Sequence, residues 1–496
     1  MLPTHQIPEK KTGLAYWADR VLLESDKASQ DFAADPVHDL RVAIRRCRSM
    51  ADGFLSVDPD PQWKEMKRLA KPLFSALGEL RDTQVMSEWI TKLSEPGDFL
   101  RERLLVMLAG KEAEQKAAAE QALKSFDRER WEALNAHLAK RTDCVPLEGL
   151  VFQHLALERW TDAYHLHRQA MRNRSAIGYH QLRIGIKRFR YTVENFLPGR
   201  HQKWSRDLRD LQDALGEVHD FDVLRVTVRV HANTHPEERA LWQKRIAEER
   251  LKRLHLYRHK MVGRQSLWGV WRAQLPSGAG LEEAALEKLR SWASFLDPDP
   301  VHSARVREIA LQLYDGLVQH GALHLVPEHR RLLEAAAVLH EVGRSKDGDG
   351  HQKRSYRMIS KLKPPLGWTT EEMHCVAAVA RYHQGALPKT SDSYFVGLNP
   401  KRRSVLLPLI GILRLANALD FEHDQSIAGI SLKRQDGSLA LYAHGLQEIS
   451  PSAERVARAR YLLETICRIP IVVLPLPAKA ATPSATSATR QAAGAS

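Results

Sequence analysis

The sequence contains the same helical motif twice, and this duplication constrains the fold more than any other feature. His38 begins the first copy and His180 begins the second, and basic residues follow each histidine at matching positions. The histidine and the basic residues three, seven and ten positions later share one flank of a helix. The matching basic pairs are Arg41 with Arg183, Arg45 with Lys187, Arg46 with Arg188, and Arg48 with Arg190.

A second motif follows each basic helix and completes the repeat. Leu-Gly-Glu-Leu-Arg-Asp occupies residues 77–82, and Leu-Gly-Glu-Val-His-Asp occupies residues 215–220. The chain therefore contains an internal duplication, with pseudo-repeats over about 11–140 and 151–265. The run 41–48 carries four cations and no acid, which costs repulsion unless an anion lies nearby. Two such helices that face each other would line one basic cleft.

The first half of the sequence predicts helices and no strands. Apolar residues recur at helical spacing over about 11–31, 62–80, 151–171 and 243–260, and residues 100–140 are rich in good helix formers. We therefore expect a mainly α, bundle-like fold. Helical spacing adds six basic residues to the expected cleft: Lys64, Arg68, Lys71, Arg81, Arg206 and Arg209.

The net charge narrows the class of partner. Lysines and arginines number 74 against 60 aspartates and glutamates, so the formal charge is +14. This charge points to nucleic acid, an acidic membrane surface or a phosphate polymer. Aromatic residues make up 7% of the chain and do not interleave the basic motifs, so base stacking has little support. We find no nucleic-acid-binding motif and expect no sequence-specific nucleic acid partner.

Cysteine usage and the apolar segments indicate the compartment. The four cysteines are far apart and form no CxxC pair, so neither a disulfide framework nor a zinc–thiolate site is supported. The N-terminus lacks the apolar core of a signal peptide. The most apolar window, 405–419, is interrupted by Pro408 and Arg414 and is too short to span a bilayer. We therefore expect a cytoplasmic protein that does not associate with a membrane.

The second half of the sequence predicts a separate domain. Residues 266–284 contain a Gly- and Pro-rich stretch and are predicted to form a linker. Residues 285–475 begin with helical patterns and then predict a hairpin, a helix and a short closing strand. The tail, 476–496, is rich in Ala, Thr and Ser and has no aromatic residue, so we expect it to be disordered.

The duplicated His-x-x-Arg-x-x-x-Arg/Lys-Arg-x-Arg motif, each copy followed by Leu-Gly-Glu-x-x-Asp, resembles the CHAD domain (conserved histidine α-helical domain) over about residues 11–265. The resemblance implies paired helical bundles with a basic groove between them. It also implies binding to inorganic polyphosphate and association with polyphosphate granules and polyphosphate-metabolising enzymes. By position, it carries over as binding residues His38, Arg41, Arg45, Arg46, Arg48, His180, Arg183, Lys187, Arg188 and Arg190.

The chemistry of the basic residues agrees with this resemblance. Polyphosphate has no bases to read, so a binder needs repeated phosphate donors, which the forked guanidinium group supplies. A competing interpretation makes the two histidines core or capping groups and the arginines a solvated face. The duplication of the whole basic set favours the phosphate interpretation.

The second domain contains histidines and acids in the order His, His-acid, His, His, Asp. This order resembles the HD superfamily of metal-dependent phosphohydrolases, and more closely the C-terminal helical domain of exopolyphosphatases and guanosine pentaphosphate phosphohydrolases. The resemblance implies a divalent metal at four positions, with a glutamate where HD domains have aspartate: His302, His340, Glu341 and Asp420.

The resemblance leaves two functions open for the second domain. In exopolyphosphatases this domain helps to bind the polymer, and catalysis belongs to an N-terminal domain with Gly-rich phosphate loops. We therefore expect a non-catalytic polyphosphate-binding protein that needs no cofactor. The alternative is an enzyme, a metal-dependent phosphohydrolase that acts on polyphosphate or a phosphorylated nucleotide. The first function predicts a second phosphate surface at His351, Lys353, Arg354, Arg381 and His383.

Overall fold

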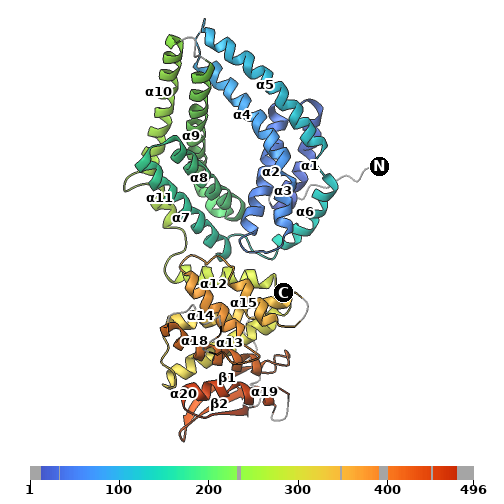
Figure 1. Cartoon of the computed structure of the whole chain (residues 1–496), viewed down its shortest axis with the longest axis vertical. Coiled ribbons are helices and arrows are strands. Elements are labelled where there is room, and N and C mark those ends of the chain that lie inside the picture. The colour runs from blue at the N-terminus through green and yellow to red at the C-terminus, as the bar shows by residue number, and fades with distance from the viewer. Residues whose placement is uncertain are drawn as a thin grey trace, which may run out of the picture. The chain divides into compact units, whose positions relative to one another are not determined.

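The structure, a computed structural model (Figure 1), is mainly α-helical and has a three-stranded sheet near the end of the described chain. The chain divides into two compact units, and the boundary lies between Ser291 and Trp292. A helix that is long and apolar enough to cross a membrane does not occur among the described residues. The described residues are 13–32, 34–95, 97–231, 236–346, 349–389, 392, 400–447 and 451–476.

The first unit contains the two predicted repeats. The first repeat comprises α1 (Leu14–Asp31), α2 (Ala34–Phe54), α3 (Gln62–Leu69), α4 (Lys71–Leu93), α5 (Phe99–Lys124) and α6 (Arg128–Thr142). The second repeat comprises α7 (Leu150–Asn173), α8 (Ala176–Phe196), α9 (Pro198–His231) and α10 (Pro236–Met261), and α11 (Leu267–Arg272) and α12 (Ala279–Ser294) follow it.

One helix boundary differs from the sequence predictions. The helix predicted over 62–80 is divided at Ala70, because Pro72 lies in the first turn of α4 and cannot continue a preceding helix. The helix α2 begins at Ala34, and Asp35 lies in its first turn. Buried apolar residues continue along α9 to Val228, which explains the length of this helix.

The two repeats contact each other first between α2 and α8. Arg46 donates hydrogen bonds to Glu194 and to Asn195, 3.1 Å away at Oδ1, and Asn195 donates to Ser49 at 2.8 Å. The ring of Phe196 fills the space beside Gly53. This end of the interface therefore joins one polar network to an apolar contact.

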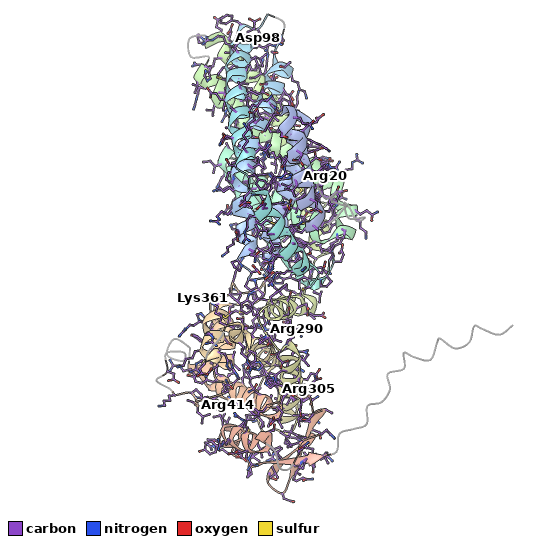
Figure 2. The ribbon with its side chains drawn as sticks, turned by 90° about the vertical axis from the view of Figure 1, so that its right-hand side faces the viewer. Arg20, Asp98, Arg290, Arg305, Lys361 and Arg414 are labelled. Carbon is purple, nitrogen blue, oxygen red and sulfur yellow. The ribbon has the colours of Figure 1, made fainter. Side chains whose placement is uncertain are left out.

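The second contact between the repeats lies along α4, α5, α9 and α10, which Figure 1 shows as two long antiparallel pairs. Trp89 and Phe221 belong to one buried apolar cluster, with ring centroids 4.6 Å apart. Asp98 at the start of α5, labelled in Figure 2, accepts hydrogen bonds from Trp242 and Arg245, each 3.0 Å long. Between these two contact regions, residues of α2 and α4 line a cavity together with residues of α8 and α9.

The segment predicted as a linker, 266–284, is largely helical and packed. Trp268 and Trp271 of α11 are buried, and Trp271 lies 5.4 Å from the ring of Phe189. Lys288 of α12 donates to Glu158 of α7 at 2.9 Å, which ties α12 to the second repeat. The linker was predicted from the Gly- and Pro-rich stretch alone, and the two buried tryptophans that pack this segment against the bundle were not taken into account. Most of the tail that we expected to be disordered, 477–496, lies outside the described residues.

The second unit contains α13 (Pro300–Gln319), α14 (Pro327–Leu339), η1 (Val342–Ser345), α15 (His351–Ile359), α16 (Thr370–Arg381), α18 (Pro400–Leu419), α19 (Pro451–Ala459) and α20 (Tyr461–Cys467). The predicted hairpin is confirmed as β1 (Gly429–Gln435) and β2 (Ser438–His444), which pair antiparallel. Asp436 and Gly437 both have positive φ, as a two-residue type I′ turn requires. The closing strand, β3 (Ile471–Leu476), pairs parallel to β2.

Candidate functional site

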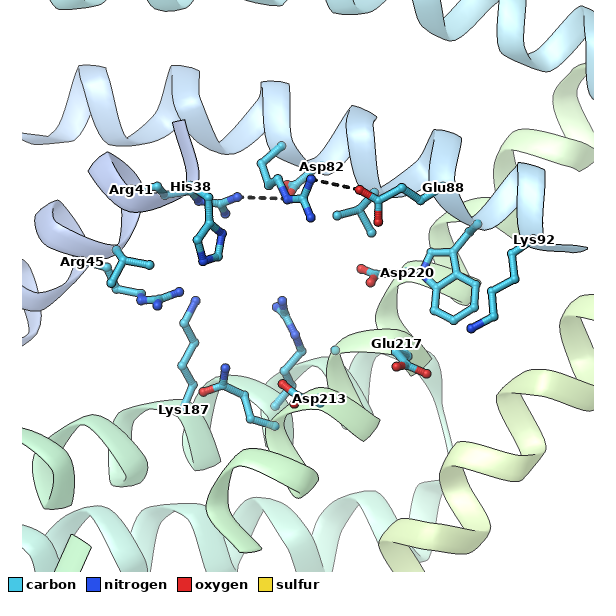
Figure 3. A pocket seen from close by; sticks show the side chains of 17 residues that line it. His38, Arg41, Arg45, Asp82, Glu88, Lys92, Lys187, Asp213, Glu217 and Asp220 are labelled. Carbon is cyan, nitrogen blue, oxygen red and sulfur yellow. Dashed lines mark hydrogen bonds and ion pairs between the residues drawn. The ribbon is translucent and has the colours of Figure 1, made fainter. Parts of the chain in front are cut away.

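Basic residues of both repeats line two adjoining cavities in the first unit. The cavities measure about 510 and 590 Å³ and share six lining residues, so we treat them together as the cleft. Figure 3 shows Arg45 of α2 and Lys187 of α8 extending toward each other across the first cavity. The lining residues that the sequence predicted, from both repeats, are His38, Arg41, Arg45, Arg81, Arg183 and Lys187.

The cationic end of the cleft, formed by Arg41, Arg45, Arg183 and Lys187, has few anionic partners. Arg41 lies 3.6 Å from Asp82. Lys187 forms no hydrogen bond or ion pair within the described chain, and its ammonium group lies 5.9 Å from the centre of the Tyr191 ring. Arg45 lies over the same ring at 5.4 Å. One tyrosine thus supports a cation from each repeat.

Acidic residues line the opposite end of the cleft. Figure 3 shows Glu217 and Asp220 of α9 away from Arg45 and Lys187. Glu217 is paired with Arg253, and Glu88 accepts a hydrogen bond from Arg81 at 3.0 Å. Asp82, Asp213 and Lys92 line the first cavity as well, so charges of both signs border it. An anion would be held at the cationic end, where Arg41, Arg45, Arg183 and Lys187 meet.

The crowding of cations changes the protonation of the lysine. Burial, together with the neighbouring Arg183, Arg45 and Arg41, lowers the pKa of Lys187 to about 8. Burial and the nearby arginines also lower the pKa of His38, so it is neutral at neutral pH in the absence of an anion. Burial raises the pKa of Asp220 to about 6. A bound anion would oppose the first two shifts because it stabilises the protonated forms.

His180 lies beside the cleft. Its Nδ1 atom lies 3.2 Å from Nδ1 of His219, which lines the second cavity. His219 occupies the position in the second repeat that Arg81 occupies in the first, so each repeat places a titratable or cationic side chain there.

Three predicted binding residues are engaged in packing and are not among the residues that line the cleft. Arg46 holds Glu194 and Asn195 at the contact between repeats. Arg48 donates to the carbonyl oxygen of Lys67 at 2.6 Å. Arg190 lies 3.8 Å from Glu194. The helical pattern placed these residues on a basic flank but did not reveal that the partner helix supplies their acceptors.

Six more predicted residues are exposed on the outer surface of the helices and do not line the cleft. They were predicted from helical spacing or from the motif, and neither shows which flank of a bundle helix faces the partner helix. They are Lys64, Arg68, Lys71, Arg188, Arg206 and Arg209.

In the second unit, the histidines and acids that the sequence singled out converge in one buried cluster. His302 lies on α13, His340 and Glu341 lie between α14 and η1, His351 begins α15, and His383 follows α16. The ligand atoms of His302, His340 and Glu341 lie within 4.8 Å of one another, and so do those of Glu341, His351 and His383. Both groups could hold a metal ion, and Glu341 belongs to both.

Local packing explains why His351 reaches Glu341. A Cβ atom on Gly343 would lie 2.2 Å from the carbonyl oxygen of His351, so only glycine lets α15 approach η1 this closely. The hydroxyl of Ser355 donates to the His340 carbonyl oxygen at 2.7 Å and accepts from the Gly343 N–H at 2.9 Å. These bonds fasten α15 to the His340-Glu341 turn.

Asp420 is placed differently from the other expected metal ligands. Its Oδ2 atom lies 2.7 Å from Nδ1 of His302. A carboxylate in this position orients an imidazole whose other nitrogen binds a metal. Asp420 therefore supports His302 in this geometry. His340 is fully buried, and burial with the neighbouring His383 lowers its pKa to about 3, so the ring is neutral.

The five residues expected to form a second phosphate surface have different surroundings. His351 and His383 lie in the histidine cluster, and Lys353 is exposed. Arg354 donates to the carbonyl oxygens of Gly343, Lys346 and Asp349, so it holds the loop before α15. Arg381 lies over the ring of Tyr382 at 5.1 Å.

The sequence analysis missed several residues of both sites. Tyr191 follows Lys187 by one helical turn, and this spacing could have revealed it. Arg344 follows Glu341 by three residues, and its Nε atom lies 3.2 Å from Glu341 Oε2. Arg344 and Lys346 line a cavity of about 500 Å³ with His351. The loop that carries them has no periodicity from which this could be read.

Comparisons with known proteins agree with the two units. Residues 14–229 match the family model described as CHAD domain, and residues 288–441 match the one described as Ppx/GppA phosphatase, domain III. A solved structure, the crystal structure of the CHAD domain from the plant Ricinus communis, is 21% identical, with a TM-score of 0.39. The match covers 50% of this chain and 88% of that chain. The chain therefore joins a CHAD domain to a Ppx/GppA phosphatase domain III.

Proposed function

We propose that this protein binds inorganic polyphosphate in the cleft of its CHAD domain. Both matched domains indicate a polyphosphate-related function. The observation that carries the proposal is the cationic end of the cleft, where Arg41 and Arg45 of the first repeat face Arg183 and Lys187 of the second. Arg41 has one acidic neighbour, Asp82 at 3.6 Å, and Lys187 has no ion pair within the described chain. The four cations together are therefore stabilised when an anion lies between them.

The shape of the site supports a chain of phosphates in preference to a single ion. The two adjoining cavities share Arg41, Arg183 and Lys187, so the basic surface continues from one cavity into the other. Each guanidinium can bond two oxygens of one phosphate, and the spread of the four cations lets successive phosphates be held. The protein then acts as a non-catalytic binder that is recruited to polyphosphate granules and to the enzymes that make or degrade the polymer.

A binding titration with labelled polyphosphate tests this proposal. We expect the full chain to bind tightly and the variant with Arg41, Arg45, Arg183 and Lys187 all replaced by Gln to lose at least a hundredfold in affinity. A matched control replaces four exposed cations outside the cleft by Gln, so that both variants lose four charges from the formal charge of +14. The control residues are Lys64, Arg188, Arg206 and Arg209.

The two variants separate a site from overall charge. The proposal requires the control to bind within about threefold of the natural chain. Equal losses in both variants would mean that net charge alone attracts the polymer. RNA added at equal phosphate should not displace polyphosphate. Trp89 is the one aromatic residue that lines the described cleft, and it is 9% exposed and packed against Phe221, so little ring surface is left on which bases could stack. Displacement by RNA would instead favour a nucleic acid partner.

A further inference from the structure

Tyr191 of α8 breaks the symmetry of the two repeats beside the cationic end of the cleft. In the alignment of the duplicated motifs, the first repeat has Ser49 at the matching position. The hydroxyl of Ser49 donates to the carbonyl oxygen of Arg46 at 2.9 Å and accepts from Asn195 at 2.8 Å, so it belongs to the packing between α2 and α8. One repeat therefore supplies the aromatic ring, although the ring contacts cations of both.

The ring of Tyr191 lies close to two cations that have few other partners. Cζ of Arg45 lies 5.4 Å from the ring centre, and Nζ of Lys187 lies 5.9 Å from it. A cation over the face of an aromatic ring at this distance is attracted by the negative π-surface. Nε of Arg45 is buried without a hydrogen-bond partner, and Lys187 has no ion pair within the described chain. The ring therefore opposes the repulsion between these two cations from different repeats.

The ring can hold the cations without neutralising them. Tyr191 is 8% exposed, and its hydroxyl oxygen has no hydrogen-bond partner among the described residues. Burial raises the pKa of Tyr191 despite the opposing effect of Arg45, so the ring is uncharged wherever Lys187 is protonated. A carboxylate at this position would attract both cations more strongly, but it would cancel charge that a bound anion needs.

We infer that Tyr191 is a positioning residue for polyphosphate binding, which holds Arg45 and Lys187 in place before the polymer arrives. The inference rests on the proposed function of the cleft. Tyr191 is not among the residues that line either cavity, so it acts through the two cations that do. Figure 3 shows those cations extending toward each other across the first cavity. Long basic side chains lose rotamer freedom when they bind, and a ring that orders them beforehand lowers this cost.

Substitutions at two tyrosines of α8 test the role of the ring. Tyr191→Leu should weaken polyphosphate binding roughly tenfold, because two cation–π contacts are lost. Tyr191→Phe keeps the ring and should bind within about twofold of the natural chain. In the matched control, Tyr179→Leu, the ring that is removed is 2% exposed and lies 5.6 Å from Arg250, which does not line the cleft. The control should keep the natural affinity, and equal losses in the two leucine variants would overturn the inference.

A fluorine series at position 191 keeps the test valid where a leucine variant does not fold. Fluorine atoms on a phenylalanine ring withdraw charge from its face and change its shape little. Replacing Tyr191 in turn by phenylalanine and by its monofluoro, difluoro and trifluoro derivatives should weaken polyphosphate binding stepwise, because the attraction for cations falls with each fluorine. A packing role predicts equal affinities along the series, and that result would contradict a positioning role.

The same series in a chain without the two cations isolates their part. With Arg45→Gln and Lys187→Met in place, affinity should no longer depend on the ring, and a stepwise loss that persists would show that Tyr191 does not act through them. Titration of the natural chain separates this inference from the function on which it rests. A natural chain that does not bind polyphosphate would overturn both claims, whereas binding with a flat fluorine series would overturn the role of Tyr191 alone.

Discussion

A Cβ atom on Gly78 would lie 3.6 Å from Nη2 of Arg41. The second repeat has the same relationship, with Gly216 placed 3.9 Å from Nε of Arg183. The glycine of each Leu-Gly-Glu motif therefore leaves room for the arginine of the basic helix in its own repeat. The two duplicated motifs therefore act together in each repeat: the glycine of the second motif has no side chain, and the arginine of the first motif occupies the space beside it in the cleft.

Replacing Gly78 by Leu should displace Arg41 and weaken polyphosphate binding by roughly 10- to 100-fold, since one charge-assisted contact is worth about 1.5–3 kcal/mol. Gly78→Ala should keep the affinity, because its methyl group would make only ordinary contact, and should stabilise α4 by about 1 kcal/mol. Gly110→Leu, on the exposed side of α5, is the matched control. The relationship would be unsupported if Gly78→Leu bound as tightly as Gly110→Leu.

Polyphosphate affinity should fall as the pH rises from 7 to 9. Lys187 has a pKa of about 8 in the free protein, so it is mostly charged at pH 7 and mostly neutral at pH 9. Bound phosphates raise that pKa, so binding near pH 8 should take up protons. Calorimetry in buffers of different ionisation enthalpy measures this uptake. Lys187→Met should bind more weakly and lose the uptake, whereas an unchanged uptake would assign it to another group.

The same Lys187→Met substitution should stabilise the fold. The folded-state pKa of Lys187 is depressed below the unfolded value of 10.5. The unfolded chain therefore binds more protons between about pH 8 and 10.5, so the cost of the charge is full below pH 8 and is lost above 10.5. We expect chemical denaturation at pH 7 to show a gain on the order of 1 kcal/mol, shrinking as the pH approaches 10.5. A lower free energy of unfolding in Lys187→Met would show that the Lys187 side chain stabilises the folded state, contrary to this prediction.

Arg45 and Arg46 are neighbours with opposite roles and form a matched pair of variants. Arg46→Gln should lower the free energy of unfolding by about 1–3 kcal/mol, because Glu194 would remain partly buried without its guanidinium partner. Its effect on polyphosphate affinity should be small. Arg45→Gln should weaken polyphosphate binding and have little effect on the free energy of unfolding. Equal effects of the two substitutions on binding would contradict the division between packing and cleft residues.

The sequence predicted the helical fold, the duplication and the small sheet because each leaves a local pattern. Helical periodicity identified α2 and α8, and the turn at Asp436-Gly437 identified the hairpin. The packed state of α11 was not foreseen, because its two tryptophans are buried by residues distant in the sequence.

The candidate sites were predicted in part for a similar reason. Self-comparison of the sequence identified Arg41, Arg45 and Lys187, since duplicated chemistry is visible without a structure. It could not separate them from Arg46, whose acceptor Glu194 lies on another helix. The meeting of His351 with Glu341 depends on the close approach at Gly343, which spacing along the chain does not encode.

The salt dependence of polyphosphate binding tests the central claim most directly. Each cation that releases a counterion adds about one to the slope of log affinity against log salt concentration. We predict that single Gln substitutions of Arg45 in the first repeat and Lys187 in the second each lower this slope by about one, and that together they lower it by about two. Slopes equal to that of the natural chain in all three variants would contradict binding of one polymer by both repeats.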